Sequence, residues 1–237
     1  MFRHDITATG VHFATPAATS GPGTARCLIL VTPDGQRTMS TYLGACVDLG
    51  PYDIEPDVIA AAQITYLEGY LFDPPRAQEA FRKAAAIAHS ARRKVALSLS
   101  DPFCVGRHRA AFRDLVGGHI DILFANEAEI CSLYETDDFA SAAAAVRGHV
   151  AIAALTRSAA GSVILGPDTE HRVAAAPVAR VVDTTGAGDL YASGFLYGLI
   201  RGLPLPTCGA IGSLCAAEII SHFGARSEVK LSELVAT

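Results

Sequence analysis

Apolar segments of strand length alternate with helical patterns along most of the chain, and this alternation restricts the fold more than any other feature. Residues 95–100, 120–125 and 150–156 read VALSLS, IDILFA and VAIAALT. Segments so continuously apolar are typical of strands buried on both faces. The sequence therefore predicts an α/β fold in which helices cover both faces of a mostly parallel sheet.

The expected elements span almost the whole chain. Strands are expected over 24–32, 37–43, 64–69, 95–100, 120–125, 150–156, 161–166 and 171–176. Helices are expected over 75–93, about 106–116, from 126 onward, 187–201 and 205–222. No repeat or linker interrupts the pattern, so residues 1–237 are expected to form a single domain.

Charge and motif content exclude several classes of function. The net charge of −5 provides no basic surface for nucleic acid. No apolar run reaches the length of a membrane span, and the first ten residues lack the apolar core of a secretory signal, so we expect a cytoplasmic protein without a membrane partner. GxxxxGK[ST], HRD and DFG motifs are absent, which excludes P-loop enzymes and protein kinases.

Polar residues cluster where the expected strands end, and ligands of parallel sheets bind beyond that edge. These residues are Glu68, Ser100, Asp101, Asn126 with Glu129, Thr156 and the loop 183–189.

The stretch VVDTTGAGDLYASGFLYG, residues 181–198, places two acids around a loop that is almost free of side chains. Gly186, Ala187 and Gly188 open a helix, whose first amides lack intrahelical partners and lie at the positive end of the helix dipole. Such a loop can bind an anion without lysine, and Asp189 could accept a proton beside it. The alternative is a glycine turn followed by an ordinary first-turn acid. A phosphorylated Asp183 is disfavoured, because no second acid follows two residues later.

Several motifs in the same order resemble the ribokinase-like, or PfkB, family of carbohydrate and nucleoside kinases. They are DTTGAGD (183–189), NEAE (126–129), LTRSAAGSVIL (155–165) and CAAEIISHFGAR (215–226). Three further segments are most similar to the bacterial adenosine kinase-like branch: RTMSTYLGA (37–45), YLEGYLF (66–72) and LSLSDPF (97–103).

The resemblance implies a ribokinase-like fold with part of a small β lid, and ATP-dependent phosphoryl transfer to a hydroxyl of a nucleoside or sugar. Adenosine is the first-choice acceptor, and ribose or a fructose phosphate is the alternative. By the same resemblance, Asp189 is the catalytic base, and Gly186, Ala187 and Gly188 form the anion hole. The expected partner is a small molecule, and a homodimer is compatible with the family.

The resemblance also implies residues that bind ATP and metal. Asn126 and Glu129 would organise the phosphates and Mg²⁺, the latter through water, although Asn-x-x-Glu equally fits a helix capping box. The remaining implied ATP contacts are Thr156, Ser158, Gly161, Thr185 and Ser213. Ser158 stands where many relatives have glycine, and Ser213 where ribokinases often have asparagine.

Two further acids each have two interpretations. Glu68 is similar to a substrate-side glutamate of ribokinases, or it is a salt-bridged acid at a strand end. Asp183 lies in a segment that binds a monovalent cation such as K⁺ in some relatives, or it is a loop acid bonded to turn amides.

The beginning of the chain departs from the family pattern. An early aspartate that grips substrate hydroxyls and a Gly-Gly motif are missing, and residues 1–45 include only partial lid strands. We therefore expect either a longer natural chain or a truncated form. The chain alone is expected to have little kinase activity, and a non-catalytic nucleotide-binding remnant is the alternative function.

Overall fold

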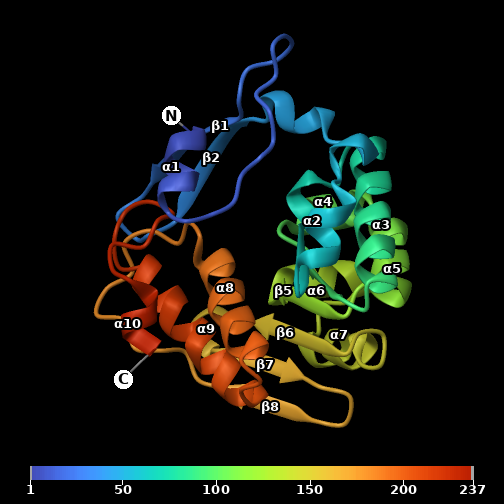
Figure 1. Ribbon diagram of the computed structural model, residues 1–237. Helices are drawn as coiled ribbons and strands as arrows, with labels where there is room; N and C mark the ends of the chain where they lie inside the picture. Colours follow the sequence, from blue (N-terminus) through green and yellow to red (C-terminus); the bar gives the residue numbers. More distant parts are fainter. Residues whose placement is uncertain (1, 236–237) are drawn as a thin grey trace.

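A computed structural model describes residues 2–235, and its main sheet has six strands in the order β3-β4-β5-β6-β7-β8 (Figure 1). The strands are β3 (Ile64–Glu68), β4 (Lys94–Ser98), β5 (Ile122–Asn126), β6 (Ile152–Thr156), β7 (Ser162–Leu165) and β8 (Glu170–Val173). β3 to β6 are parallel, whereas β7 pairs antiparallel with both neighbours. The short connections 157–161 and 166–169 permit only hairpins, because a parallel crossover needs about a dozen residues. The predicted α/β fold with a mostly parallel sheet is confirmed.

Helices connect the strands and cover both faces of the sheet. They are α1 (Phe2–Ala8), α2 (Pro56–Ala61), α3 (Pro75–Ser90), α4 (Pro102–Arg107), α5 (Arg109–Gly118), α6 (Glu127–Tyr134), α7 (Phe139–Val146), α8 (Ala187–Ile200), α9 (Leu205–Ile219) and α10 (Leu231–Val235). Short 3₁₀ turns span Gly44–Asp48, Pro51–Asp53, Gly69–Leu71 and Ser158–Ala160. None of the helices within residues 2–235 has the length and hydrophobicity needed to cross a membrane.

Three predicted helix boundaries are wrong. The helix expected over 75–93 ends at Ser90. The helix expected over about 106–116 is divided into α4 and α5 at His108, which has non-helical φ and ψ of −120° and 26° and whose Nε2 lies 2.7 Å from the Asp73 carboxylate. The helix expected to reach residue 222 ends at Ile219, because the chain turns so that the carbonyl of Ile220 accepts a hydrogen bond from Val182 N at 2.8 Å.

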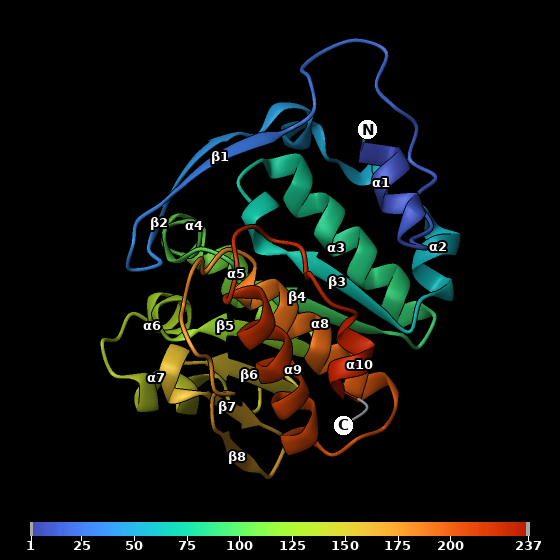
Figure 2. The same ribbon diagram turned by 90° about the vertical axis from the view of Figure 1, so that its left-hand side faces the viewer.

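Side chains alternate between two cores, one on each face of the sheet. Leu123 and Ala125 of β5 belong to the core that includes α3 and α5 to α7, whereas Ile122 and Phe124 pack with α8 and α9. Figures 1 and 2 show these two helical layers on opposite sides of the sheet. This period of two explains why the central strands are apolar at every position.

A separate antiparallel hairpin, β1 (Arg26–Val31) and β2 (Arg37–Tyr42), forms the predicted small β sheet. Its side chains are mostly exposed, and it lies outside the main sheet in Figure 2. The turn between its strands is nevertheless buried at Gly35, where a Cβ would lie 3.0 Å from Val181 Cγ1. The hairpin is therefore anchored to the segment that leads into α8.

α8 and α9 approach closely where Gly194 faces α9. A Cβ at this position would lie 2.8 Å from Cys215 Sγ and 2.9 Å from the carbonyl oxygen of Ile211. Because backbone cannot move aside cheaply, a larger residue must separate the helices.

We expect Gly194→Ala to lower the free energy of unfolding by about 1–3 kcal/mol through overpacking, measured by urea denaturation. Gly118→Ala at the end of α5 is the control, because a Cβ there has no heavy atom within 4 Å. The control should be neutral or more stable by up to about 1 kcal/mol, since alanine favours the helix. Equal effects of the two substitutions would contradict the close contact.

Candidate functional site

The carboxyl ends of the parallel strands bring the predicted polar residues to one edge of the sheet. Glu68 and Ser98 are register partners at the ends of β3 and β4, and Asn126 and Thr156 are partners at the ends of β5 and β6. The N-terminus of α8 lies beside this edge, since the charge of Asp189 acts on Glu68. Their chemical roles remain predictions.

The loop before α8 presents backbone amides without partners. Gly186 is the N-cap of α8 with a φ of 83°, in the region that favours glycine. The amide of Ala187 donates to Thr184 O at 3.3 Å, whereas the amides of Gly186, Gly188 and Asp189 donate to no other described residue. A Cβ at Gly188 would meet no heavy atom within 4 Å, so this side of the loop is open. These amides can therefore bind an anion.

Asp183 is buried and holds this loop together. Its Oδ1 accepts hydrogen bonds from Thr185 N at 2.9 Å and Thr185 Oγ1 at 2.6 Å, and its Oδ2 accepts from Gly224 N at 3.1 Å. Burial alone would raise the pKa of Asp183, but these hydrogen bonds and the charge of Arg37 hold it below its usual range. The contacts support the interpretation as a loop acid. They also engage both hydrogen-bond donors of Thr185, a predicted ATP contact.

Asp189 lies in the first turn of α8 and reaches solvent. The surrounding protein raises its pKa, and the positive charge of Arg37 opposes this rise. Arg37, the first residue of β2, also donates a hydrogen bond from Nη1 to Thr184 Oγ1. No motif marked this arginine in the sequence, because its partner lies 147 positions away.

Asn126 and Glu129 form a complete capping box at the start of α6. Glu129 N donates to Asn126 Oδ1 at 2.9 Å, and the Glu129 carboxylate accepts from Asn126 N at 2.9 Å and from Asn126 Nδ2 at 2.6 Å. Burial raises the pKa of Glu129 to about 7, although the hydrogen bond from the backbone amide of Asn126 lowers it. The capping interpretation is therefore correct as local structure.

A metal held mainly by phosphates and water fits this end of the sheet better than one in a protein cage. Within residues 2–235, no group of three or more His, Cys, Asp or Glu side chains is placed to hold a metal ion. Mg²⁺ needs only one or two carboxylates when phosphates and water complete its shell. Glu129 is a buried carboxyl of this kind, and each of its oxygens has a lone pair beyond the capping contacts.

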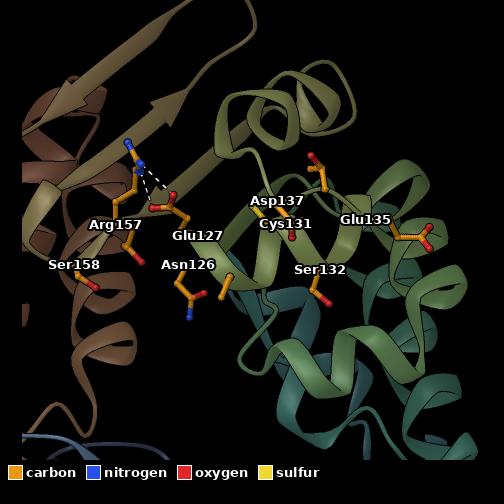
Figure 3. A pocket seen from close by; sticks show the side chains of 11 residues that line it. Asn126, Glu127, Cys131, Ser132, Glu135, Asp137, Arg157 and Ser158 are labelled. Carbon is orange, nitrogen blue, oxygen red and sulfur yellow. Dashed lines mark hydrogen bonds and ion pairs between the residues drawn. The ribbon is translucent and has the colours of Figure 1, made fainter.

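Apart from Thr185 in the loop before α8, some of the predicted ATP contacts line a concavity and others lie outside it. Asn126, Thr156 and Ser158 line one open concavity of about 800 Å³ beside α6 (Figure 3). Arg157 lines it too, and its guanidinium binds both carboxylate oxygens of Glu127 at 2.8 and 3.0 Å. Ser158 has a φ of 50°, a glycine-like conformation that explains why glycine would suit this position.

Gly161 and Ser213 lie outside this concavity. Gly161 has a φ of 82°, and a Cβ there would come within 2.0 Å of Val173 O, so only glycine fits. The Ser213 hydroxyl accepts from Ala176 N at 2.7 Å and links α9 to the segment after β8. Both residues shape the backbone next to the predicted site, and their contact with a nucleotide remains a prediction.

Glu68 is surrounded by hydroxyl groups. Its Oε1 accepts from Ser100 Oγ, and its Oε2 accepts from the Tyr66 hydroxyl at 3.4 Å. Burial, followed by the charge of Asp189, raises the pKa of Glu68 to about 7. No cationic side chain among residues 2–235 forms an ion pair with it, so the interpretation as a salt-bridged acid is wrong.

The sequence and this geometry match one family of known proteins. The model of the pfkB family carbohydrate kinases matches residues 1–231. The chain belongs to this family.

Solved structures agree with this assignment. A probable sugar kinase from Rhizobium etli is 51% identical, with a TM-score of 0.96 over 99% of this chain and 72% of its own. An adenosine kinase from Sinorhizobium meliloti is 50% identical, with the same TM-score and coverage. Both confirm the ribokinase-like fold.

Curated relatives are matched over shorter parts. An uncharacterized sugar kinase from Archaeoglobus fulgidus is 38% identical over 106 residues, which are 44% of this chain and 42% of that protein. The chain thus spans less than half of the length of this relative.

We expect Glu129 to make the stability of the protein dependent on pH. Its folded pKa of about 7 lies above the usual value of 4.5, so its contribution is complete below about pH 4.5 and lost as the pH rises through 7. Glu129→Gln keeps the capping box but cannot titrate. Relative to this variant, the parent should lose roughly 2–3 kcal/mol of unfolding free energy between pH 5 and pH 8.

Chemical denaturation of both proteins at several pH values measures this difference. Glu68 titrates in both proteins, and the charge of Glu129 contributes less to its pKa than burial and Asp189 do, so most of the Glu68 effect cancels in the comparison. A constant difference over this pH range would show that Glu129 is already ionised at pH 5.

Proposed function

We propose that this protein transfers the terminal phosphoryl group of ATP to a hydroxyl group of a nucleoside or sugar. The observation that carries the proposal is the position of Asp189 in the same helical turn as the unpaired amides of Gly186 and Gly188. An anion site and a carboxylate base side by side are the two parts that such a transfer needs from the protein.

In this proposal the amides at the start of α8 hold oxygen atoms of the transferred group, where negative charge must be stabilised. Asp189 accepts the proton of the attacking hydroxyl. Its raised pKa makes it a stronger base than an ordinary aspartate, and the charge of Arg37 opposes this rise and so favours the ionised form that can accept a proton. Asp183 takes no part in the proton transfer, because it is buried and its oxygens fix the loop.

Glu129 and Asn126 are the residues that we assign to Mg²⁺ and the phosphates. When bound, Mg²⁺ neutralises the phosphate charge. Glu129 would hold it through water while Asn126 fixes the orientation of the carboxylate. Thr156 and Ser158 border the same concavity and are assigned to the nucleotide. The described contacts around Asp183 provide no support for K⁺.

Adenosine is our first choice of acceptor. The Sinorhizobium meliloti neighbour, 50% identical, is an adenosine kinase, and the Rhizobium etli neighbour at 51% is called a probable sugar kinase. Glu68 lies close to Asp189 and has no cationic partner within residues 2–235, and we assign it to a hydroxyl of the acceptor.

The proposal is tested by measuring ADP and phosphorylated product with MgATP and adenosine, ribose or fructose 6-phosphate. We expect the highest kcat/KM with adenosine. ATP binding without transfer to any of these acceptors would instead favour a nucleotide-binding role.

Asp189→Asn should reduce kcat by roughly 10²–10⁴ and leave ATP affinity unchanged, because it removes the base but keeps the shape of the loop. Turnover and ATP binding are measured on the same preparation, with Asp168→Asn in the exposed β7–β8 turn as control. A kcat within tenfold of the parent would exclude Asp189 as the base.

Transfer should require Mg²⁺, and Glu129→Gln should raise the Mg²⁺ concentration for half-maximal rate by roughly tenfold, since it removes a charged partner. Glu127→Gln is the matched control, because Glu127 lies in the same helical turn but pairs with Arg157. Equal midpoints for all three proteins would leave Glu129 with its capping role alone.

A further inference from the structure

The end of β4 has an unusual backbone conformation at Ser100. Its φ is 66°, in the left-handed region that favours glycine, and Asp101 N donates to Leu99 O at 2.8 Å across it. A turn closed between residues two apart with a positive φ is rare and strained. Strain of this kind persists where the surroundings enforce it, and it is enriched at functional sites.

The neighbouring contacts explain how this turn is enforced. Asp101 caps α4 by accepting from Phe103 N at 3.1 Å and Cys104 N at 3.0 Å. The end of β3 presses against the same turn, since a Cβ on Gly69 would lie 2.4 Å from Ser98 O and 2.7 Å from Leu99 O. The backbone at position 100 is therefore fixed from both sides, and glycine would fit it with less strain.

The side chain of Ser100 provides the reason for serine at this position. Its hydroxyl donates to Glu68 Oε1, and Ser98 Oγ lies 3.2 Å from the same hydroxyl. The Tyr66 hydroxyl donates to the other oxygen of Glu68 at 3.4 Å. Two hydroxyl groups, those of Ser100 and Tyr66, thus donate to the two oxygens of one half-buried carboxyl.

The charges near Glu68 repel its carboxylate and so favour an orientation that points away from Asp189. The ionisable groups that act on it are the carboxyls of Asp189 and Glu129 and the phenol of Tyr66, and none of them is cationic. Repulsion by Asp189 disfavours a carboxylate that points toward it. Three hydrogen-bond donors oppose this repulsion: the backbone amide of Tyr70 and the hydroxyl groups of Tyr66 and Ser100.

We propose that Ser100 is a positioning residue, whose strained turn aims its hydroxyl at Glu68 and so holds that carboxyl toward the acceptor beside Asp189. This role rests on the proposed function of the site, because Glu68 is assigned there to an acceptor hydroxyl. Ser100 itself touches neither ATP nor acceptor in this arrangement. It acts through Glu68.

Two substitutions separate the hydroxyl from the backbone strain. Ser100→Ala removes the hydroxyl and keeps the strain, whereas Ser100→Gly removes both. Both variants should raise the KM for the acceptor about tenfold, with the KM for ATP within twofold of the parent. Ser100→Gly should melt at or above the temperature of the parent. A parent-like acceptor KM in Ser100→Gly would overturn the proposal, because a purely structural serine is replaced well by glycine here.

A double-mutant cycle tests whether Ser100 acts through Glu68. In a Glu68→Ala background, Ser100→Gly should change the acceptor KM by less than twofold. An undiminished tenfold change in that background would overturn the proposal.

A measurement without turnover distinguishes failure of this proposal from failure of the proposed function. The titration of the Glu68 carboxyl is followed by carbon-13 NMR in the parent and in Ser100→Gly, with Glu68→Gln to assign the signal. Loss of a donor to the charged form should move the titration midpoint upward from about 7. An unchanged midpoint in Ser100→Gly would overturn the contact between Ser100 and Glu68. A raised midpoint in Ser100→Gly, together with a parent that phosphorylates no acceptor, would overturn the proposed function alone.

Discussion

The buried carboxylate of Asp183 is the constraint on which the geometry of the site depends. Its hydrogen bonds join the loop before α8 to Gly224, beyond the end of α9, two segments far apart in the sequence. The loop can expose the amides of Gly186 and Gly188 because Asp183, rather than those amides, satisfies its internal hydrogen bonds. The first amides of a helix lack intrahelical partners, and here one buried acid fixes the loop that presents them.

The balance of charge follows from the same arrangement. Glu68, Glu129 and Asp189 all have raised pKa values, and Arg37 is the basic residue that acts on Asp189. The chain has three lysines, none of them in this loop. The site is rich in carboxylates, and much of its positive potential comes from backbone dipoles. An anion is therefore attracted mainly to the start of α8. Charge therefore directs where a phosphate can lie, while the acids remain free to interact with hydroxyls or with a metal ion.

Most of the fold could be predicted from the sequence, because continuous apolar strands and helical periods are local signals. The main boundary errors occur where tertiary contacts override propensity, as at His108, which leaves the helix to meet Asp73. Motifs located Asp189, Gly186 and Glu129, but contacts between distant segments were not predictable. Arg37 reaches Thr184 from a separate hairpin, and the conformation of Ser100 depends on the approach of Gly69 from the next strand.

The attachment of the β1–β2 hairpin to the loop before α8 has a thermodynamic consequence. Gly35 packs on Val181, Gly35 O accepts from the Thr184 hydroxyl, and Arg37 donates to the same hydroxyl. The affinity of the loop amides for an anion can differ between two positions of the hairpin. In that case, binding of the anion changes the equilibrium between these positions. Linkage makes this effect reciprocal. If the anion changes the affinity of the hairpin for a second molecule by some factor, that molecule changes the affinity of the loop for the anion by the same factor.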